Sequence, residues 1–329
     1  MAELRAFRIR RDDAGFDARL TDMQLHEQTA GDVVIDVRFS SVNYKDALAG
    51  SGKGRILRRP ELNGGIDLAG VVSESASADF AVGDEVFVCG AGLSETLDGG
   101  YATRARLPAS VLRRPPPGLS LRDTMAIGTA GITAAIALQR LEENGQPKDN
   151  GPILVTGATG GVGSFATHLL TLAGYEVTAS SGKPEAEAYL RSLGAGDVVG
   201  RLGGDTPPKA LESAVWGGAV DSIGGETLSR LASTTRPWGS IACIGLAGGS
   251  DFSASVMPLI LRGVSLVGIN CIELPDAMLD RCWERLGSDW KPQLLDTIAP
   301  HQCDLDGLPA IFDAMMQGAV TGRTVVNVT

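Results

Sequence analysis

Hydrophobic and polar residues follow different patterns in the first and the later part of the chain. In the first part, short apolar runs at 32–38, 68–72 and 85–88 are separated by glycines, and 32–38 reads DVVIDVR. Alternation of apolar and polar residues with a period of two is typical of a half-buried β-strand. Many short strands with frequent turns predict a compact, barrel-like β domain.

From residue 151 onward, continuous apolar runs alternate with segments of helical periodicity. The helical segments are 162–172 and 184–193, and the second has Pro184 in its first turn and Gly194 just after its end, as helices favour. Strands that alternate with helices predict a parallel sheet covered by helices on both faces. The predicted strands are 153–155, which is expected to be buried, and 176–179, 197–199, 219–222, 241–244 and 266–269.

Three further segments predict the domain organisation. Residues 113–118 read RRPPPG, and three consecutive prolines continue neither a helix nor a central strand, so they indicate a domain junction. The charge-free run 125–138 predicts a helix buried between domains, and TVVNV at 324–328 predicts a strand that returns to the N-terminal domain. We therefore expect one domain formed by 1–124 and 273–329, and a second formed by 125–272.

Length and charge narrow the class of protein. A chain of 329 residues is long enough for about two domains, and 29 Lys and Arg against 39 Asp and Glu leave a net charge of −10. An acidic chain without a basic tail is not expected to bind nucleic acid. An anionic ligand must therefore meet a local cluster of cations, because the overall charge repels it.

The cysteines and the N-terminal residues indicate a cytoplasmic protein. The five cysteines are scattered and form no CxxC pair, which argues against a disulfide framework and a structural zinc site. The N-terminus is charged and lacks the apolar core of a signal peptide. The uncharged run 150–175 exceeds the length of a membrane span, but six glycines and Pro152 divide it into a strand, a turn and a helix. We therefore expect no membrane segment.

A glycine-rich turn is the strongest candidate for a ligand site. In PILVTGATGGVGS, Gly157, Gly160 and Gly163 stand three residues apart between a predicted strand and a predicted helix. In dinucleotide-binding folds the first glycine allows the tight turn, the second lets the backbone approach the pyrophosphate, and the third lets helix and strand pack closely. The helix N-terminus then offers free N–H groups to the phosphates.

The end of the next strand predicts NADP in preference to NAD. NAD-binding folds carry an Asp or Glu about 20 residues after the first glycine, which binds the ribose 2′-hydroxyl. This chain has Ser180, Ser181 and Lys183 there, and no carboxylate before Glu185. Two hydroxyls and an ammonium group suit a 2′-phosphate, although the serines also suit helix capping. Arg201 either reaches the same phosphate, stacks on adenine, or is an ordinary solvated arginine.

The chain resembles the medium-chain dehydrogenase/reductase superfamily and, within it, the acrylyl-CoA reductases formerly grouped with putative quinone oxidoreductases. The segments that carry the resemblance are SSVNYKDALAGSGKG (40–54), GIDLAG (65–70), GTAGITA (128–134), VTGATGGVGS (155–164), IGLAGG (244–249), VMPLILRGV (256–264) and GRTVVNV (322–328). The resemblance implies an α/β fold class, with a GroES-like β-rich catalytic domain and a Rossmann domain built on a doubly wound parallel sheet.

The same comparison argues against zinc. Zinc-dependent members of the superfamily place a cysteine ligand and a GHE histidine at positions that here read Asn43-Tyr44-Lys45-Asp46 and Gly65-Ile66-Asp67. The lobe with four cysteines is also missing, so we expect no metal.

The resemblance implies an NADPH-dependent, dimeric, cytoplasmic enzyme that reduces acryloyl-CoA to propionyl-CoA. In marine bacteria this reaction serves dimethylsulfoniopropionate catabolism. An NADPH:quinone reductase would share the fold and the cofactor. A catalytically silent NADPH-binding protein, like the members that became lens crystallins, is an alternative of another class.

The resemblance also implies site residues. Tyr44 is the first candidate catalytic residue, because a phenol beside the nicotinamide can donate a proton or a hydrogen bond, and Asn43 is expected to orient substrate or nicotinamide. Arg323, in the final turn, is expected to contact cofactor or substrate. The residues expected to contact the cofactor are Tyr44, Thr159, Gly160, Gly161, Val162, Ser180, Ser181, Lys183, Arg201, Gly245, Leu246, Ile269, Asn270, Cys271 and Arg323.

A basic segment is the candidate site for the phosphates of coenzyme A. Lys53, Arg55, Arg58 and Arg59 lie between Ser51 and Pro60 with no acidic residue among them. In a chain of net charge −10, this cluster either binds CoA phosphates or forms a solvated loop face.

Overall fold

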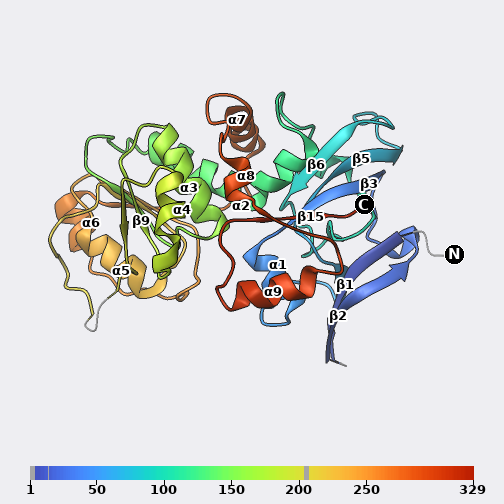
Figure 1. The fold of residues 1–329 in the computed structure, drawn as a ribbon, viewed down its shortest axis with the longest axis horizontal. Helices are drawn as coiled ribbons and strands as arrows, with labels where there is room; N and C mark the ends of the chain where they lie inside the picture. The colour runs from blue at the N-terminus through green and yellow to red at the C-terminus, as the bar shows by residue number, and fades with distance from the viewer. Residues whose placement is uncertain (1–3, 14, 204–206) are drawn as a thin grey trace. The chain divides into compact units, whose positions relative to one another are not determined.

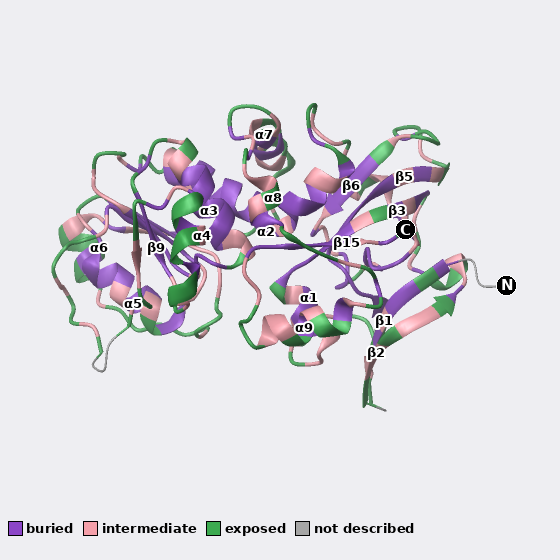
Figure 2. Cartoon of the chain, in the orientation of Figure 1, coloured by how far each residue is buried: buried purple, intermediate pink, exposed green. Residues whose placement is uncertain are grey.

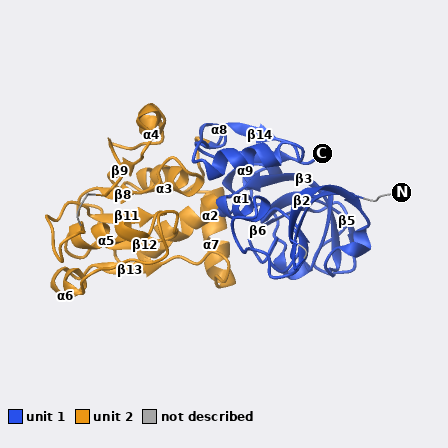
Figure 3. Cartoon of the chain, turned by 90° about the horizontal axis from the view of Figure 1, so that it is seen from below, with its two compact units in different colours: residues 1–129, 295–329 blue, residues 130–294 orange. Residues whose placement is uncertain are grey.

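The computed structural model describes residues 4–13, 15–203 and 207–329. The chain forms two compact units (Figure 3): unit 1 contains Met1–Thr129 and Leu295–Thr329, and unit 2 contains Ala130–Leu294. The proline-rich segment 113–118 therefore lies within unit 1, and the chain leaves that unit inside helix α2 (Leu121–Glu143). Helix α7 (Asp276–Gly287), which the sequence-based division places in the N-terminal domain, is grouped with unit 2.

Unit 1 is built mainly from antiparallel strands (Figure 1). One sheet has the order β2-β1-β4, and the other has the order β14-β15-β3-β5-β6, with β7 also paired to β3. The strands are β1 Leu4–Asp12, β2 Gly15–Met23, β3 Val33–Val42, β4 Glu61–Asn63, β5 Asp67–Ser75, β6 Glu85–Cys89, β7 Arg104–Leu107, β14 His301–Cys303 and β15 Thr324–Asn327. The helical elements are η1 Leu25–Glu27, α1 Tyr44–Gly50, η2 Ala109–Val111, α8 Leu295–Ile298 and α9 Leu308–Met316, in addition to the start of α2.

The alternating pattern at 32–38 forms part of β3, which is a central strand of the larger sheet. Ile35 and Val37 are fully buried and belong to one hydrophobic cluster with Phe7 and Phe312, whose rings meet edge to face with centroids 5.6 Å apart. β15 pairs antiparallel with β3, which confirms that the C-terminal strand returns to the N-terminal domain.

Unit 2 contains a parallel sheet of six strands in the order β10-β9-β8-β11-β12-β13. Numbered within the sheet this is 3-2-1-4-5-6, the order of a dinucleotide-binding fold. Figure 2 shows the burial of strand β9, and β8 and β11 are likewise fully buried. The strands are β8 Ile153–Val155, β9 Val177–Ser180, β10 Asp197–Val199, β11 Gly218–Asp221, β12 Ser240–Cys243 and β13 Ser265–Gly268.

The helices of unit 2 partly follow the sequence-based prediction. The predicted helix 162–172 is α3 (Gly161–Leu172), whereas the predicted helix 184–193 is divided into a 3-10 turn, η3 (Pro184–Ala186), and a short α4 (Glu187–Ser192). Helices α5 (Gly225–Thr234) and α6 (Met257–Arg262) complete the unit with α7. Among the described residues, no helix combines the length and the apolar character needed to cross a membrane.

Candidate active site and cofactor-binding site

The glycine turn follows β8 directly and leads into α3. Gly157 has φ +58°, a conformation that favours glycine, and a Cβ on Gly163 would collide with the carbonyl oxygen of Gly157. Gly160 is exposed at the N-cap of α3, where Gly161 and Val162 are half-buried and Thr159 is buried. The first N–H groups of an α-helix have no partner within the helix, so this turn can hold a phosphate.

The ends of β9 and β10 bring the predicted NADP-selecting residues together. The Ser180 hydroxyl is buried and donates to the carbonyl of Gly200 at 2.9 Å, and the Ser181 hydroxyl accepts from the backbone N–H of Lys183 at 3.0 Å. Partial burial lowers the pKa of Lys183, and Glu185 opposes this shift. Arg201 lies against Gly182 so closely that a Cβ on Gly182 would collide with the guanidinium.

The remaining strands place further residues at the same edge of the sheet. Asp221, which the sequence analysis did not single out, ends β11 and is buried; it accepts from Thr156 Oγ1 at 2.5 Å and from Gly224 N at 2.9 Å. This carboxylate ties the loop after β11 to the end of β8. The available signal was a carboxylate inside the otherwise uncharged predicted strand 219–222.

The loops after β12 and β13 contain the other predicted cofactor contacts. Gly245 packs against the backbone of Ser222, and Leu246 is 64% exposed. Ile269 continues β13, and the side-chain oxygen of Asn270 accepts from the backbone N–H of Ile272 at 2.9 Å. Because all six strands are parallel, these loops and the glycine turn lie at the carboxyl edge of one sheet, the usual ligand edge of such folds.

In unit 1, Tyr44 is the first residue of α1. Its side chain is 46% exposed, and its hydroxyl makes no hydrogen bond to another described residue. The preceding residue, Asn43, caps the helix, and its backbone N–H donates to Asp46 Oδ2 at 2.9 Å. An N-cap followed by an acidic residue three positions later is a favoured way to begin a helix.

Asn43 faces the interior. Its Nδ2 donates to Asp67 Oδ2 at 2.8 Å and to Asp46 Oδ2 at 3.2 Å, and its Oδ1 accepts from Arg323 at 2.8 Å. Asn43 is only 8% exposed, and its amide is fully engaged by these protein partners. The structure therefore places Asn43 as a residue that supports Tyr44, in contrast to the expected contact with substrate or nicotinamide.

Asp46 is a buried carboxyl group beside a second one. Burial, together with the nearby charge of Asp67, raises its pKa from 3.8 to about 7. The backbone N–H groups of Asn43 and Ile66 donate to it at 2.9 Å and oppose the shift. This pair of carboxyl groups was not predicted from the sequence.

Arg323 is 2% exposed in the core of unit 1. Its five N–H groups have five protein acceptors: Ala126 O, Val42 O, Asn43 Oδ1, Ser41 Oγ and Met125 O. A guanidinium has no further donors, so none is left for a ligand. The predicted contact of Arg323 with cofactor or substrate disagrees with this arrangement, and its buried position could not be seen from its place beside Gly322.

The basic segment 51–60 is anchored, and its four cations are exposed. Ile56 and Leu57 pack against the core of unit 1, and Arg11 holds the carbonyls of Gly52 and Gly54. Lys53, Arg55 and Arg59 form no ion pair with a described residue. Arg58 lies 3.7 Å from Glu95, an acidic residue remote in sequence, which also pairs with Lys45.

Three of the five cysteines offer little nucleophilic chemistry. Burial raises the pKa of Cys243 and Cys303 to about 11 and that of Cys282 to about 12. A thiol with such a pKa is almost entirely protonated at neutral pH. Within the described part of the chain, no group of three or more His, Cys, Asp or Glu side chains could hold a metal ion.

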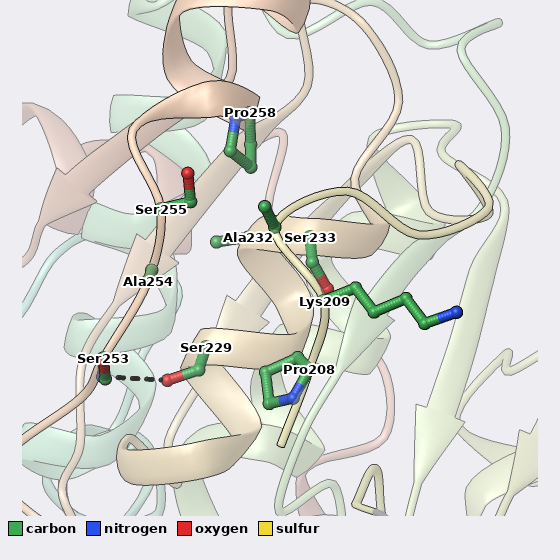
Figure 4. Close-up of a pocket in the computed structure, with 10 residues that line it drawn as sticks. Pro208, Lys209, Ser229, Ala232, Ser233, Ser253, Ala254, Ser255 and Pro258 are labelled. Carbon is green, nitrogen blue, oxygen red and sulfur yellow. Dashed lines mark hydrogen bonds between the residues drawn. The ribbon is translucent and has the colours of Figure 1, made fainter. Parts of the chain in front are cut away.

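One small cavity of unit 2 lies away from the strand ends described above. Its volume is about 160 Å³, and Figure 4 shows Ser229 on α5 facing Ser253, whose backbone N–H donates to the Ser229 hydroxyl at 3.1 Å. Lys209 extends away from the other lining residues. The cavity contains none of the residues predicted to bind cofactor or substrate.

Two protein-family models match this chain. The alcohol dehydrogenase GroES-like domain matches residues 29–116, and the zinc-binding dehydrogenase domain matches residues 161–286. These matches confirm the predicted fold class, a GroES-like domain combined with a Rossmann-like parallel sheet.

Three proteins are similar over most of the chain. YhfP of Bacillus subtilis, named a putative quinone oxidoreductase, is 44% identical over 90% of each chain, and its crystal structure with NAD bound has a TM-score of 0.94. Acrylyl-CoA reductase AcuI of Ruegeria pomeroyi is 41% identical over 94% of each chain. The crystal structure of Escherichia coli YhdH with bound NADPH has a TM-score of 0.94 at 38% identity and covers 98% of this chain and 100% of that one.

Proposed function

Because the chain belongs to the medium-chain dehydrogenase/reductase superfamily and is an NADPH-dependent oxidoreductase, we propose that it reduces acryloyl-CoA to propionyl-CoA. The similarity to acrylyl-CoA reductase over nearly the whole chain carries this proposal. The exposed cations of segment 51–60 support a substrate that bears phosphates.

The residues at the carboxyl edge of the unit 2 sheet fit NADPH. The glycine turn is shaped for close backbone approach, since a Cβ on Gly163 would collide with Gly157. Ser181 and Arg201 lie on either side of Gly182, where a 2′-phosphate would find a hydroxyl and a guanidinium. NADPH, when bound, supplies the hydride that the substrate β-carbon accepts.

Tyr44 is the proposed catalytic residue of unit 1. When a conjugated thioester accepts hydride at its β-carbon, negative charge develops on the thioester oxygen, and a hydrogen-bond donor at that oxygen lowers the barrier. Tyr44 is 46% exposed, and its hydroxyl has no competing partner among the described residues.

The basic segment is the proposed site for the CoA phosphates. Arg55 and Arg59 have no ion pair with a described residue, whereas Arg58 shares Glu95 with Lys45. Replacing both Arg55 and Arg59 with Ala is expected to raise the KM for acryloyl-CoA about tenfold, with the Kd for NADPH unchanged. Arg19→Ala, an exposed arginine on β2, is the control. An unchanged KM in the double variant would remove CoA binding from this segment.

The reaction itself is tested by the fate of the hydride. NADPH labelled with deuterium at the transferred position is mixed with acryloyl-CoA, and the CoA products are examined by mass spectrometry and NMR. The proposal expects propionyl-CoA with one deuterium at the β-carbon. Consumption of NADPH with a quinone and no labelled propionyl-CoA would favour the quinone reductase, and NADPH binding without turnover would favour the silent protein.

We also propose that the enzyme is a homodimer of the cytoplasm. β13 is an edge strand of the unit 2 sheet, and the neighbouring segment and helix α6 expose Val256, Ile260 and Leu261 at 61%, 74% and 63%. An unpaired edge beside apolar side chains suits pairing with a second copy.

The five free cysteines suit a reducing compartment, which supports the proposed location in the cytoplasm. A role in dimethylsulfoniopropionate catabolism rests on the resemblance to acrylyl-CoA reductases.

A further inference from the structure

Helix α2 is interrupted at Gly128, one residue before the chain leaves unit 1. Gly128 has φ +51° and ψ −164°, so the backbone there is not helical. In a continuous helix the N–H of Thr129 would donate to Met125 O, but here it donates to Asp67. A Cβ on Gly128 would collide with Arg323, Asp67 and Ser41, so the two charged side chains occupy the break itself.

Arg323 and Asp67 replace the missing helix hydrogen bonds. Arg323 donates to Ala126 O at 3.0 Å and to Met125 O at 3.2 Å. Its guanidinium therefore caps the C-terminus of the first half of the helix. Asp67 accepts from Thr129 N at 3.0 Å and from the Thr129 hydroxyl. Its carboxylate therefore caps the N-terminus of the second half of the helix. The two charges lie 3.7 Å apart and are both buried.

The same two side chains hold the start of α1. Arg323 donates to Asn43 Oδ1 and to Val42 O, and Asp67 accepts from Asn43 Nδ2. Ser41 joins the pair, since its hydroxyl donates to Asp67 and accepts from Arg323 at 2.7 Å. The backbone on the N-terminal side of Tyr44 is therefore fixed by groups that are themselves fixed by the break in α2.

We infer that Asp67 and Arg323 are positioning residues for Tyr44, which couple the break in α2 to the N-terminus of α1. The inference rests on the proposed function in one respect only, that Tyr44 faces the reacting substrate. Neither side chain has a donor or acceptor aimed at a ligand; their effect on the reaction passes through Asn43. Misplacing Tyr44 by a fraction of a side-chain width is enough to lower the rate strongly.

A kinetic cycle separates positioning from general stability. Asp67→Asn and the milder Ser41→Ala are each made in the wild-type protein and in Tyr44→Phe. Each is expected to lower kcat with acryloyl-CoA about tenfold or more in the wild type and less than about twofold in Tyr44→Phe, with the Kd for NADPH unchanged. Asp306→Asn, at an exposed ion pair with Arg5, is the matched control. Where Tyr44→Phe itself lowers kcat, equal losses in both backgrounds overturn the inference.

A second measurement does not depend on activity. The chain has four tyrosines, so fluorotyrosine labelling gives a simple fluorine NMR spectrum, in which Tyr44→Phe identifies the Tyr44 signal. The Tyr44 signal is expected to shift or broaden in Ser41→Ala and Asp67→Asn, while Tyr175 and Tyr189 of unit 2 keep theirs. A Tyr44 signal unmoved in folded variants overturns the inference. If the signal moves but Tyr44→Phe keeps full kcat, the inference stands and the proposed role of Tyr44 fails.

Discussion

At the scale of single residues, Tyr44 differs from its neighbours Asn43 and Asp46. Tyr44 is 46% exposed and its hydroxyl has no partner among the described residues, whereas the side chains of Asn43 and Asp46 are buried and hydrogen-bonded within unit 1. Tyr44→Phe keeps the ring and removes the hydroxyl, so kcat with acryloyl-CoA is expected to fall about 100-fold. The Kd for NADPH, measured from the fluorescence of the cofactor, is expected to change little. Tyr175→Phe removes a 3.3 Å hydrogen bond in unit 2 and serves as the control. Full activity in Tyr44→Phe would exclude the hydroxyl from the reaction.

Asp46 links the same region to pH. Its pKa is 3.8 in an unfolded chain and about 7 in the folded one, so between these values the folded protein keeps a proton that the unfolded chain has lost. Its contribution to stability is therefore complete at low pH and is lost as the pH rises through about 7, at up to about 1.4 kcal/mol per pH unit.

The comparison with Asp46→Asn isolates this contribution. The variant lacks the titrating group, so the free energy of unfolding of the wild type should decline relative to that of the variant as the pH rises toward neutrality. Urea unfolding at a series of pH values measures both. A difference that is independent of pH would show that Asp46 is ionised throughout.

From the sequence we could propose residues for the site, but not the direction in which their side chains point. Asn43 and Arg323 were expected at a ligand, and both lie inside, because a motif read along the chain does not reveal that Asp67 of β5 approaches them. The serines and Arg201 were predicted from chemistry, since a carboxylate is absent where NAD-binding folds carry one, and their contact with NADPH stays a prediction.

At the scale of elements, the break in α2 gives a direct test of packing. Gly128→Ala places a methyl group against Arg323 and Asp67 at a backbone conformation with φ +51°, whereas Gly145→Ala meets nothing within 4 Å at φ +72°. In the control, only the strained backbone conformation lowers the free energy of unfolding, by about 1 kcal/mol. Gly128→Ala is expected to cost at least about 3 kcal/mol in urea unfolding, because buried charges lose partners. Equal costs would mean that the break can relax.

Helix α2 also shows a feature that the hydrophobic pattern could not predict, the break at Gly128. The apolar run 125–138 predicted a helix correctly, but nothing in its periodicity signals a break that side chains from β5 and the last turn fill. The strands β1 and β2 were not predicted, because arginines and aspartates interrupt their apolar alternation. The six parallel strands were predicted from their short apolar runs, which are needed most where a strand is fully buried, as in β8, β9 and β11.

At the scale of the whole molecule, assembly is tested at the exposed edge of the unit 2 sheet. Ile260→Asp places a charge on an apolar side chain that is 74% exposed, so it should leave the fold intact and abolish the proposed dimer. Light scattering after gel filtration measures the mass, and Val82→Asp, a 67% exposed valine of unit 1, is the control. A dimer that survives Ile260→Asp would place the interface elsewhere, and a monomeric wild type would remove it.

The proposed reaction is decided by NADPH oxidation with acryloyl-CoA, crotonyl-CoA and a simple quinone in parallel. We expect acryloyl-CoA to be the preferred substrate, with kcat/KM in the range of about 10⁴–10⁸ M⁻¹s⁻¹ typical of enzymes on their own substrates. Rapid turnover of the quinone with no turnover of either thioester would contradict the proposed reaction, while leaving the fold and the NADPH site in place.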